Sequence, residues 1–158
     1  MMKEQALQKI RHFCGYQERC HREVKEKLYS FKLRKPVVEE IICQLIEESY
    51  LDEERFAIQF AGGKFRMLNW GRNKIVYELK QRGVSQYCIN KAMKEIDDEA
   101  YCQALQKLAE RKWALLEKEG SNAARQQKTR MYLMQKGYEA SYIEPVLKSL
   151  RQSAASTL

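Results

Sequence analysis

Two histidines and two cysteines near the start of the sequence are the residues best suited to bind a metal. His12, Cys14, Cys20 and His21 form the pattern H-x-C-x5-C-H, and imidazole and thiolate groups are the usual ligands of structural zinc. However, this spacing fits no standard zinc finger, and the sequence lacks a second cluster of cysteine and histidine. We therefore predict no metal site and no cofactor.

The residue types also give little support for catalysis. Only two histidines are present, and no signature of a cysteine nucleophile surrounds Cys14 or Cys20. The sequence has neither a P-loop nor a glycine-rich nucleotide fingerprint. The acids of YLDEERF, residues 50–56, are conceivable metal ligands, but adjacent acids at a helix start more often cap the helix. We predict a protein that is not an enzyme and has no catalytic residue.

Basic side chains are concentrated between residues 63 and 82, where the only acid is Glu78. The whole chain has a formal charge of +8. Such an excess suits a polyanion partner, and it equally suits a solvated helix face whose long side chains cover apolar surface. Base-specific contacts are not indicated, because no expected helix has Asn, Gln or Arg clustered at its N-terminal end. The candidate contacts for a partner or nucleic acid, called the basic stripe below, are Lys64, Arg66, Arg72, Lys74, Lys80 and Arg82.

The elements that carry these residues are predicted to be helices. Among 158 residues only 7 are Gly and 2 are Pro, too few for the turns of a strand-rich fold. Apolar residues make up 44% of the chain, enough for packed cores. No apolar run approaches the ~20 residues that span a membrane, and the first ten residues lack the apolar region of a signal peptide. We expect an all-α cytoplasmic monomer that does not enter a membrane.

The five cysteines are not expected to form disulfides. Their number is odd, they form no tight pairs, and the predicted compartment is reducing. We predict that they are small apolar residues on buried helix faces. They are Cys14, Cys20, Cys43, Cys88 and Cys102.

Three stretches of the sequence resemble one another: CHREVKEKLYSFKL, GRNKIVYELKQRGV and QQKTRMYLMQKGYE. Their anchoring leucines, Leu28, Leu79 and Leu133, are 51 and 54 residues apart, which indicates one supersecondary unit used three times. Repeats of this kind stabilise one another through neighbour contacts, so we expect an elongated array that can curve. The predicted parts are three-helix repeats at 1–48, 49–96 and 97–150 and a flexible tail at 151–158.

The middle repeat, with a net charge of +4, is the most basic and shows the clearest helix boundaries. Asp52 is expected to cap a helix that runs to about Met67. A second helix is expected from near Asn69 to Gln81 or Arg82, followed by Gly83 as a left-handed C-cap.

The third repeat carries similar signals. Gly137 matches Gly83 of the middle repeat, and Ser141 with Glu144 is expected to form a capping box for the last helix. No periodic pattern continues beyond Leu150, so we expect the chain to fray there.

The middle repeat resembles the central signature of the bacterial RecX family of regulatory proteins. The segments YLDEERFAIQF and NWGRNKIVYELKQRGV, followed by I-x-x-A, occur in the order found in that family. RecX proteins are built from tandem three-helix repeats, which agrees with the repeats inferred from spacing. The signature residues, which we expect to be mainly structural, are Tyr50, Asp52, Arg55, Phe56, Ala57, Phe60, Gly71, Ile75, Leu79 and Gly83.

This resemblance implies a modulator of the recombinase RecA. RecX proteins bind RecA, typically in the deep groove of its filament on single-stranded DNA, and they block filament extension or promote disassembly. Recombination, ATP hydrolysis and the co-protease signal of the SOS response are thereby reduced. The family supplies no catalytic residue. We expect the basic stripe to face the filament or its DNA, an assignment that rests on charge alone.

The alternative is a helical-repeat protein that binds DNA through the same basic face, independently of the recombinase. The two hypotheses differ in their salt dependence. Binding dominated by phosphates weakens steeply as salt rises, whereas binding to a protein filament also uses apolar contacts and retains affinity better.

Overall fold

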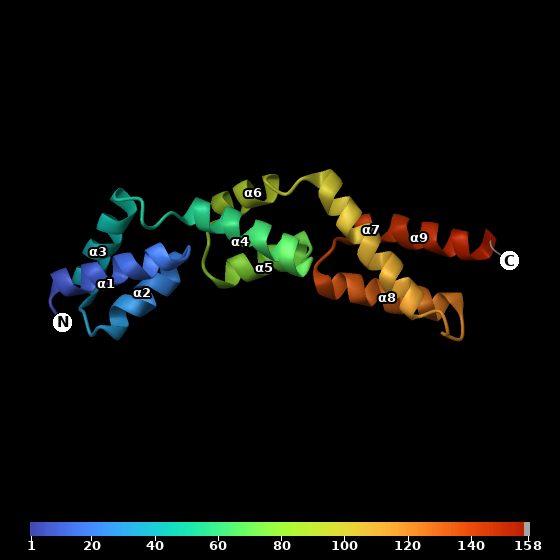
Figure 1. Ribbon diagram of the computed structural model, residues 1–158, viewed down its shortest axis with the longest axis horizontal. Coiled ribbons are helices and arrows are strands. Elements are labelled where there is room, and N and C mark those ends of the chain that lie inside the picture. The colour runs from blue at the N-terminus through green and yellow to red at the C-terminus, as the bar shows by residue number, and fades with distance from the viewer. Residues whose placement is uncertain (157–158) are drawn as a thin grey trace. The chain divides into compact units, whose positions relative to one another are not determined.

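Capping residues and helical apolar spacing divide this chain into short helices. The structure, a computed structural model, describes residues 1–156, with side chains described through residue 154. Within that range the backbone forms nine helices and no strand, which confirms the predicted all-α class (Figure 1). The helices are α1 Lys3–Tyr16, α2 His21–Ser30, α3 Lys35–Glu47, α4 Glu53–Leu68, α5 Arg72–Gln81, α6 Gln86–Lys94, α7 Asp98–Leu115, α8 Asn122–Lys136 and α9 Ala140–Ser156.

The chain divides into two compact units. Unit 1 comprises Met1–Ala61 and Glu78–Met93, and unit 2 comprises Gly62–Tyr77 and Lys94–Leu158. Helices α4 and α5 therefore each contribute one part to unit 1 and the other part to unit 2. The repeat boundaries at residues 48 and 96 stay predictions.

Unit 1 contains a bundle of α1, α2 and α3, in which each helix contacts the other two (Figure 1). Fully buried side chains from all three helices form its core, including Ile10, Val24, Leu28, Ile41 and Leu45. Burying a side chain of this size stabilises the fold by roughly 1.5–3 kcal/mol. The amphipathic spacing of these residues therefore determines which face of each helix turns inward.

The acidic run of the middle repeat is a helix start, as predicted. The Oδ1 atom of Asp52 accepts a hydrogen bond from the backbone N–H of Arg55 at 3.0 Å. Glu53 and Glu54 occupy the first turn of α4, where negative charge is favourable at the positive end of the helix dipole. Phe56, in the next turn, is buried. These acids therefore serve the local structure of α4.

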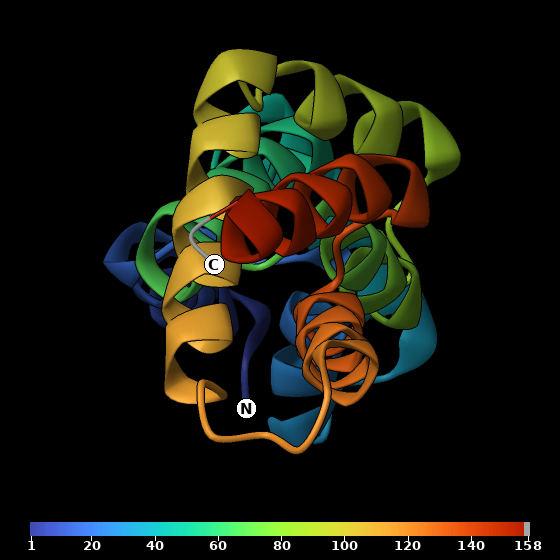
Figure 2. The ribbon, with the colours of Figure 1, turned by 90° about the vertical axis from the view of Figure 1, so that its right-hand side faces the viewer.

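Unit 2 contains a bundle of α7, α8 and α9, which pack against one another (Figure 2). Tyr101 and Leu105 of α7, Leu133 of α8, and Ile143 and Leu147 of α9 are buried in its core. The three leucines used to align the repeats are all fully buried, Leu133 here and Leu28 and Leu79 in unit 1. The repeat alignment therefore identified equivalent core positions.

Two glycine turns have the same hydrogen-bond geometry, as the sequence predicts. Gly83 and Gly137 adopt left-handed φ values of 75° and 102°. Val84 N–H donates to the carbonyl of Leu79, and Tyr138 N–H donates to the carbonyl of Leu133. Both turns thus satisfy carbonyl groups that the helix end leaves without partners.

Helix α5 begins at Arg72, three residues later than predicted. Asn69 has a left-handed φ of 56°, and its backbone N–H donates to the carbonyl of Phe65, so it ends α4. Gly71 donates its backbone N–H to the carbonyl of Lys136. Asn69 therefore closes α4 locally, whereas Gly71 is held by a tertiary contact that local sequence signals do not reveal.

The last helix differs from prediction at both ends. The predicted capping box is wrong, because Ile143 N–H donates to the carbonyl of Glu139 and α9 already begins at Ala140. The Glu144 carboxylate instead binds Arg130 at 2.6 Å. Helix α9 continues through Ser156, since no Gly or Pro interrupts the segment after Leu150. Residues 157–158 of the predicted flexible tail lie outside the described residues.

The cysteines follow the prediction only in part. Cys14, Cys20 and Cys88 are buried, Cys43 and Cys102 are exposed, and all are free thiols. The expected burial is therefore wrong for Cys43 and Cys102, which lie on outer helix faces. Burial raises the pKa of the Cys14 thiol to about 11, which keeps it protonated and unreactive at neutral pH.

Candidate functional site

The Arg72 side chain of the basic stripe is enclosed by groups of unit 2. Its guanidinium carbon lies 3.9 Å from the centre of the Tyr101 ring, and its nitrogens pair with Asp98 at 3.1 Å and Glu139 at 3.4 Å. Burial acts to lower the pKa of Arg72, but hydrogen bonds with Tyr142 and Asp98 and the charge of Glu139 raise it above its ordinary value. With 18% of the side chain exposed, little of Arg72 remains for a partner.

Tyr101 connects the starts of α5 and α9 to α7. Its hydroxyl accepts a hydrogen bond from the backbone N–H of Arg72 at 2.9 Å and donates one to Glu139. That N–H is among the donors that a helix start leaves without an internal partner. Burial is the main cause that raises the pKa of Tyr101, and the hydrogen bond to Glu139 raises it further.

Asp97 caps α7 by accepting a hydrogen bond from the backbone N–H of Ala100. Sequence reasoning missed the role of Tyr101, although Tyr101 lies four residues after this cap, as Phe56 lies four residues after Asp52.

The connection between α4 and α5 lies directly against the turn between α8 and α9. Gly71 N–H donates to the carbonyl of Lys136 at 2.7 Å, and the Tyr138 hydroxyl donates to the carbonyl of Asn69 at 3.0 Å. A Cβ atom on Gly71 would overlap the backbone of Gly137 and Tyr138. The signature glycine at 71 is therefore needed because two backbones approach too closely for a side chain.

Unit 1 contains a related contact. Arg22, at the start of α2, donates to the carbonyl of Gln81, and its guanidinium lies over Gly83, 3.1 Å from the position of an added Cβ. In unit 1, the start of α2 thus contacts the glycine turn after α5. In unit 2, the start of α5 contacts the glycine turn after α8. The second helices of consecutive repeats are therefore related in the same way. Arg55 of the family signature adds an ion pair with Glu18 in unit 1.

Two lysines of the basic stripe cover the Trp70 ring. The Nζ atoms of Lys64 and Lys74 lie 5.1 and 4.6 Å from its centre, within the range of a cation–π interaction. Both lysines are half-buried. The structure therefore brings Lys64 and Lys74 together, in an arrangement where basic side chains cover apolar surface.

The remaining three residues of the stripe differ in their availability. Arg82 pairs with Glu78 at 2.9 Å, and its guanidinium lies 4.6 Å from the centre of the Phe60 ring. Arg66 and Lys80 are exposed and form no ion pair within residues 1–156. Lys80 and Arg82 belong to unit 1, whereas the other four belong to unit 2. Arg66 and Lys80 are thus the stripe residues with the most freely available charge.

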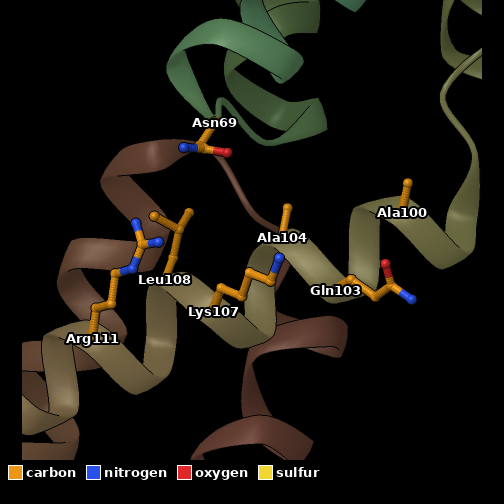
Figure 3. A pocket seen from close by; sticks show the side chains of 7 residues that line it. All are labelled: Asn69, Ala100, Gln103, Ala104, Lys107, Leu108 and Arg111. Carbon is orange, nitrogen blue, oxygen red and sulfur yellow. The ribbon is translucent and has the colours of Figure 1, made fainter.

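A shallow depression on α7 of unit 2 contains residues that the sequence interpretation did not single out (Figure 3). Its volume is about 210 Å³. The floor is apolar, and polar or basic side chains surround it. The lining residues are Asn69, Ala100, Gln103, Ala104, Lys107, Leu108 and Arg111. The signal in the sequence was the four-residue spacing of Gln103, Lys107 and Arg111, beside alanines with the same spacing.

The described residues contain neither a cluster of metal ligands nor a helix suited to a membrane. Among residues 1–156, no three His, Cys, Asp or Glu side chains converge as metal ligands would. None of the helices in that range has both the length and the apolar character needed to cross a lipid bilayer.

The geometry above is that of an all-helical protein made of tandem three-helix repeats. The sequence matches two protein families over these repeats. They are "RecX, second three-helix domain" at residues 52–93 and "RecX, third three-helix domain" at residues 98–147. The chain belongs to the RecX family of regulatory proteins.

Individual relatives agree with this assignment. A "Regulatory protein RecX" of Pelodictyon phaeoclathratiforme is 33% identical over 128 residues, covering 81% of this chain and 78% of the relative. Another, from Clostridium tetani, is 32% identical over 84% of this chain, but the chain spans only 61% of that relative's length. The crystal structure of RecX from Lactobacillus salivarius matches 94% of this chain and 96% of its own, with a TM-score of 0.85 and 22% identity. The structural match confirms the fold.

Proposed function

We propose that this chain is a non-enzymatic modulator of the recombinase RecA. It binds RecA and its filament on single-stranded DNA and inhibits filament extension. ATP hydrolysis, recombination and the SOS co-protease function of RecA decrease as a result. Membership of the RecX regulatory family is the observation that supports this function most strongly.

The basic stripe contributes to this binding mainly through its exposed members. Lys80 and Arg66 have charges that no carboxylate of the described chain neutralises. An exposed, unpaired cation attracts an anionic surface of the partner and thereby raises the rate of association. Arg72, in contrast, supports the contact indirectly by holding α5 against α7.

The deciding experiment measures the rate of single-stranded-DNA-dependent ATP hydrolysis by RecA from the same organism. The protein is added first well below and then at one copy per recombinase, in moderate salt. Progressive inhibition at the lower ratio supports filament capping or disassembly. Unchanged hydrolysis at both ratios would reject the proposal and favour the alternative of DNA binding without the recombinase. A steep fall of binding with salt, as for phosphate contacts, would support that alternative.

A further inference from the structure

The depression on α7 carries charge that the chain itself does not use. Lys107 and Arg111 are exposed and form no ion pair, hydrogen bond or ring contact within residues 1–156. In the same unit, Arg125 donates to the Trp113 carbonyl and Arg130 binds Glu144. No carboxylate lines the depression. Two unpaired cations one helical turn apart are therefore available to an external anion.

The wall opposite these cations is held in place by tertiary contacts. Asn69 has a left-handed backbone, and its carbonyl accepts the hydrogen bond from the Tyr138 hydroxyl. Figure 3 shows Asn69 above α7, with Leu108 between the charged ends of Lys107 and Arg111 in this view. The backbone of this wall is thus fixed before any partner arrives, which lowers the entropic cost of binding against it.

The floor determines which class of partner fits. Ala100 and Ala104 expose part of their surface, and Leu108 lies beside them. Sites for single-stranded nucleic acid combine cations with aromatic rings on which bases stack, and no aromatic side chain lines this depression. A small apolar floor bordered by cations and amides instead suits the side chains of a protein.

We propose that this depression binds a protein segment of the recombinase that presents a carboxylate beside a small apolar side chain. The inference rests on the proposed function for the identity of the partner. Arg111 can hold a carboxylate through two parallel hydrogen bonds, with Lys107 adding a second positive charge. The apolar side chain lies on Ala104 and Leu108.

The test compares three variants with the wild-type protein at one fixed salt concentration. K107E/R111E reverses both charges of the depression. K94E/K148E makes the same change in net charge at two exposed, unpaired lysines of unit 2 outside it. Ala104→Leu fills the floor without changing charge. Two affinities are measured for each protein, one for RecA filaments on single-stranded DNA by co-sedimentation and one for the bare oligonucleotide.

We expect K107E/R111E and Ala104→Leu each to weaken filament binding about tenfold or more, as substitutions at central contacts do. K94E/K148E should stay within about twofold of wild type, and none of the variants should lose more affinity for the oligonucleotide than this control. Equal losses for both charge-reversal pairs, or an unaffected Ala104→Leu protein, would overturn the inference while leaving the proposed function standing. So would a loss of oligonucleotide binding specific to K107E/R111E, because the cations would then contact DNA. A wild-type protein that fails to bind filaments would overturn the proposed function itself, and this inference with it.

Discussion

The backbones of Gly71 and Gly137 are in direct contact in unit 2. A Cβ atom on Gly71 would overlap the carbonyl group of Gly137, and one on Gly137 would lie 2.7 Å from the backbone nitrogen of Lys74. The left-handed φ of Gly137 adds a conformational requirement that Gly71 does not share. The two glycines are thus needed for different reasons at one contact.

We expect Gly71→Ala to lower the free energy of unfolding of unit 2 by about 1–3 kcal/mol, the usual cost of forcing atoms into a packed site. Gly63→Ala is the matched control, because nothing lies within 4 Å of its added Cβ. Since Gly63 is inside α4, this change should instead stabilise the helix by roughly 0.5–1 kcal/mol. Urea unfolding followed by tryptophan fluorescence reports on unit 2, which contains both tryptophans. Equal effects of the two substitutions would contradict the close approach.

Removing the Tyr101 hydroxyl should lower the free energy of unfolding by more than the small size of this group suggests. In Tyr101→Phe, the Arg72 N–H and the Glu139 carboxylate each lose a partner. A polar group left unpaired in a protein interior costs about 1–3 kcal/mol. Tyr77→Phe, at a tyrosine that is 59% exposed, should change the unfolding free energy by less than about 0.5 kcal/mol. The expected difference is read from the same urea transitions, and a Tyr101→Phe protein as stable as the control would show that water replaces these bonds.

The basic stripe should separate into residues that hold the fold and residues that affect function. Lys80→Ala is expected to leave the unfolding free energy within about 0.5 kcal/mol of wild type and to weaken inhibition of RecA ATP hydrolysis. Arg72→Ala should lower the stability of unit 2 by about 1–3 kcal/mol, because Glu139 and Asp98 lose their cation. Thermal unfolding and the hydrolysis assay, run on both proteins, test this division. Full inhibition by the Lys80 variant would remove that residue from the contact surface.

Acid should destabilise unit 2 through carboxylates whose pKa is lowered by folding. The Arg130 guanidinium lowers the pKa of Glu144 below its ordinary value of 4.5, so the unfolded chain takes up a proton more readily than the folded one. This contribution to stability is complete above about pH 5 and is lost as pH falls through the folded pKa. Urea midpoints between pH 7 and pH 3 should therefore decline at the acid end. In Glu144→Gln the decline should be shallower, and an unchanged slope would argue against the Arg130–Glu144 pair.

Local signals predicted most of the helices. Asp52, Gly83 and Gly137 each act through neighbours in sequence, so their types alone indicated a cap and two turns. The start of α5 and the burial of Arg72 depend on contacts with residues between 26 and 67 positions later, and no pattern within one repeat encodes such contacts. Charge alone likewise could not distinguish Lys80, which is unpaired, from Arg72, which its own unit neutralises.

The bond between the Tyr138 hydroxyl and the Asn69 carbonyl joins residues 69 positions apart, whereas α7, α8 and α9 are consecutive helices. Closing a longer loop costs more chain entropy, and folding slows as contacts become more distant in sequence. The three consecutive helices should therefore form first during refolding, and the segment around Gly71 should dock afterwards. Trp113 in α7 and Trp70 beside Gly71 provide separate reporters once either one is replaced by Phe. A Trp70 signal that lags behind the Trp113 signal is the expected order, and simultaneous changes would mean that unit 2 folds in a single step.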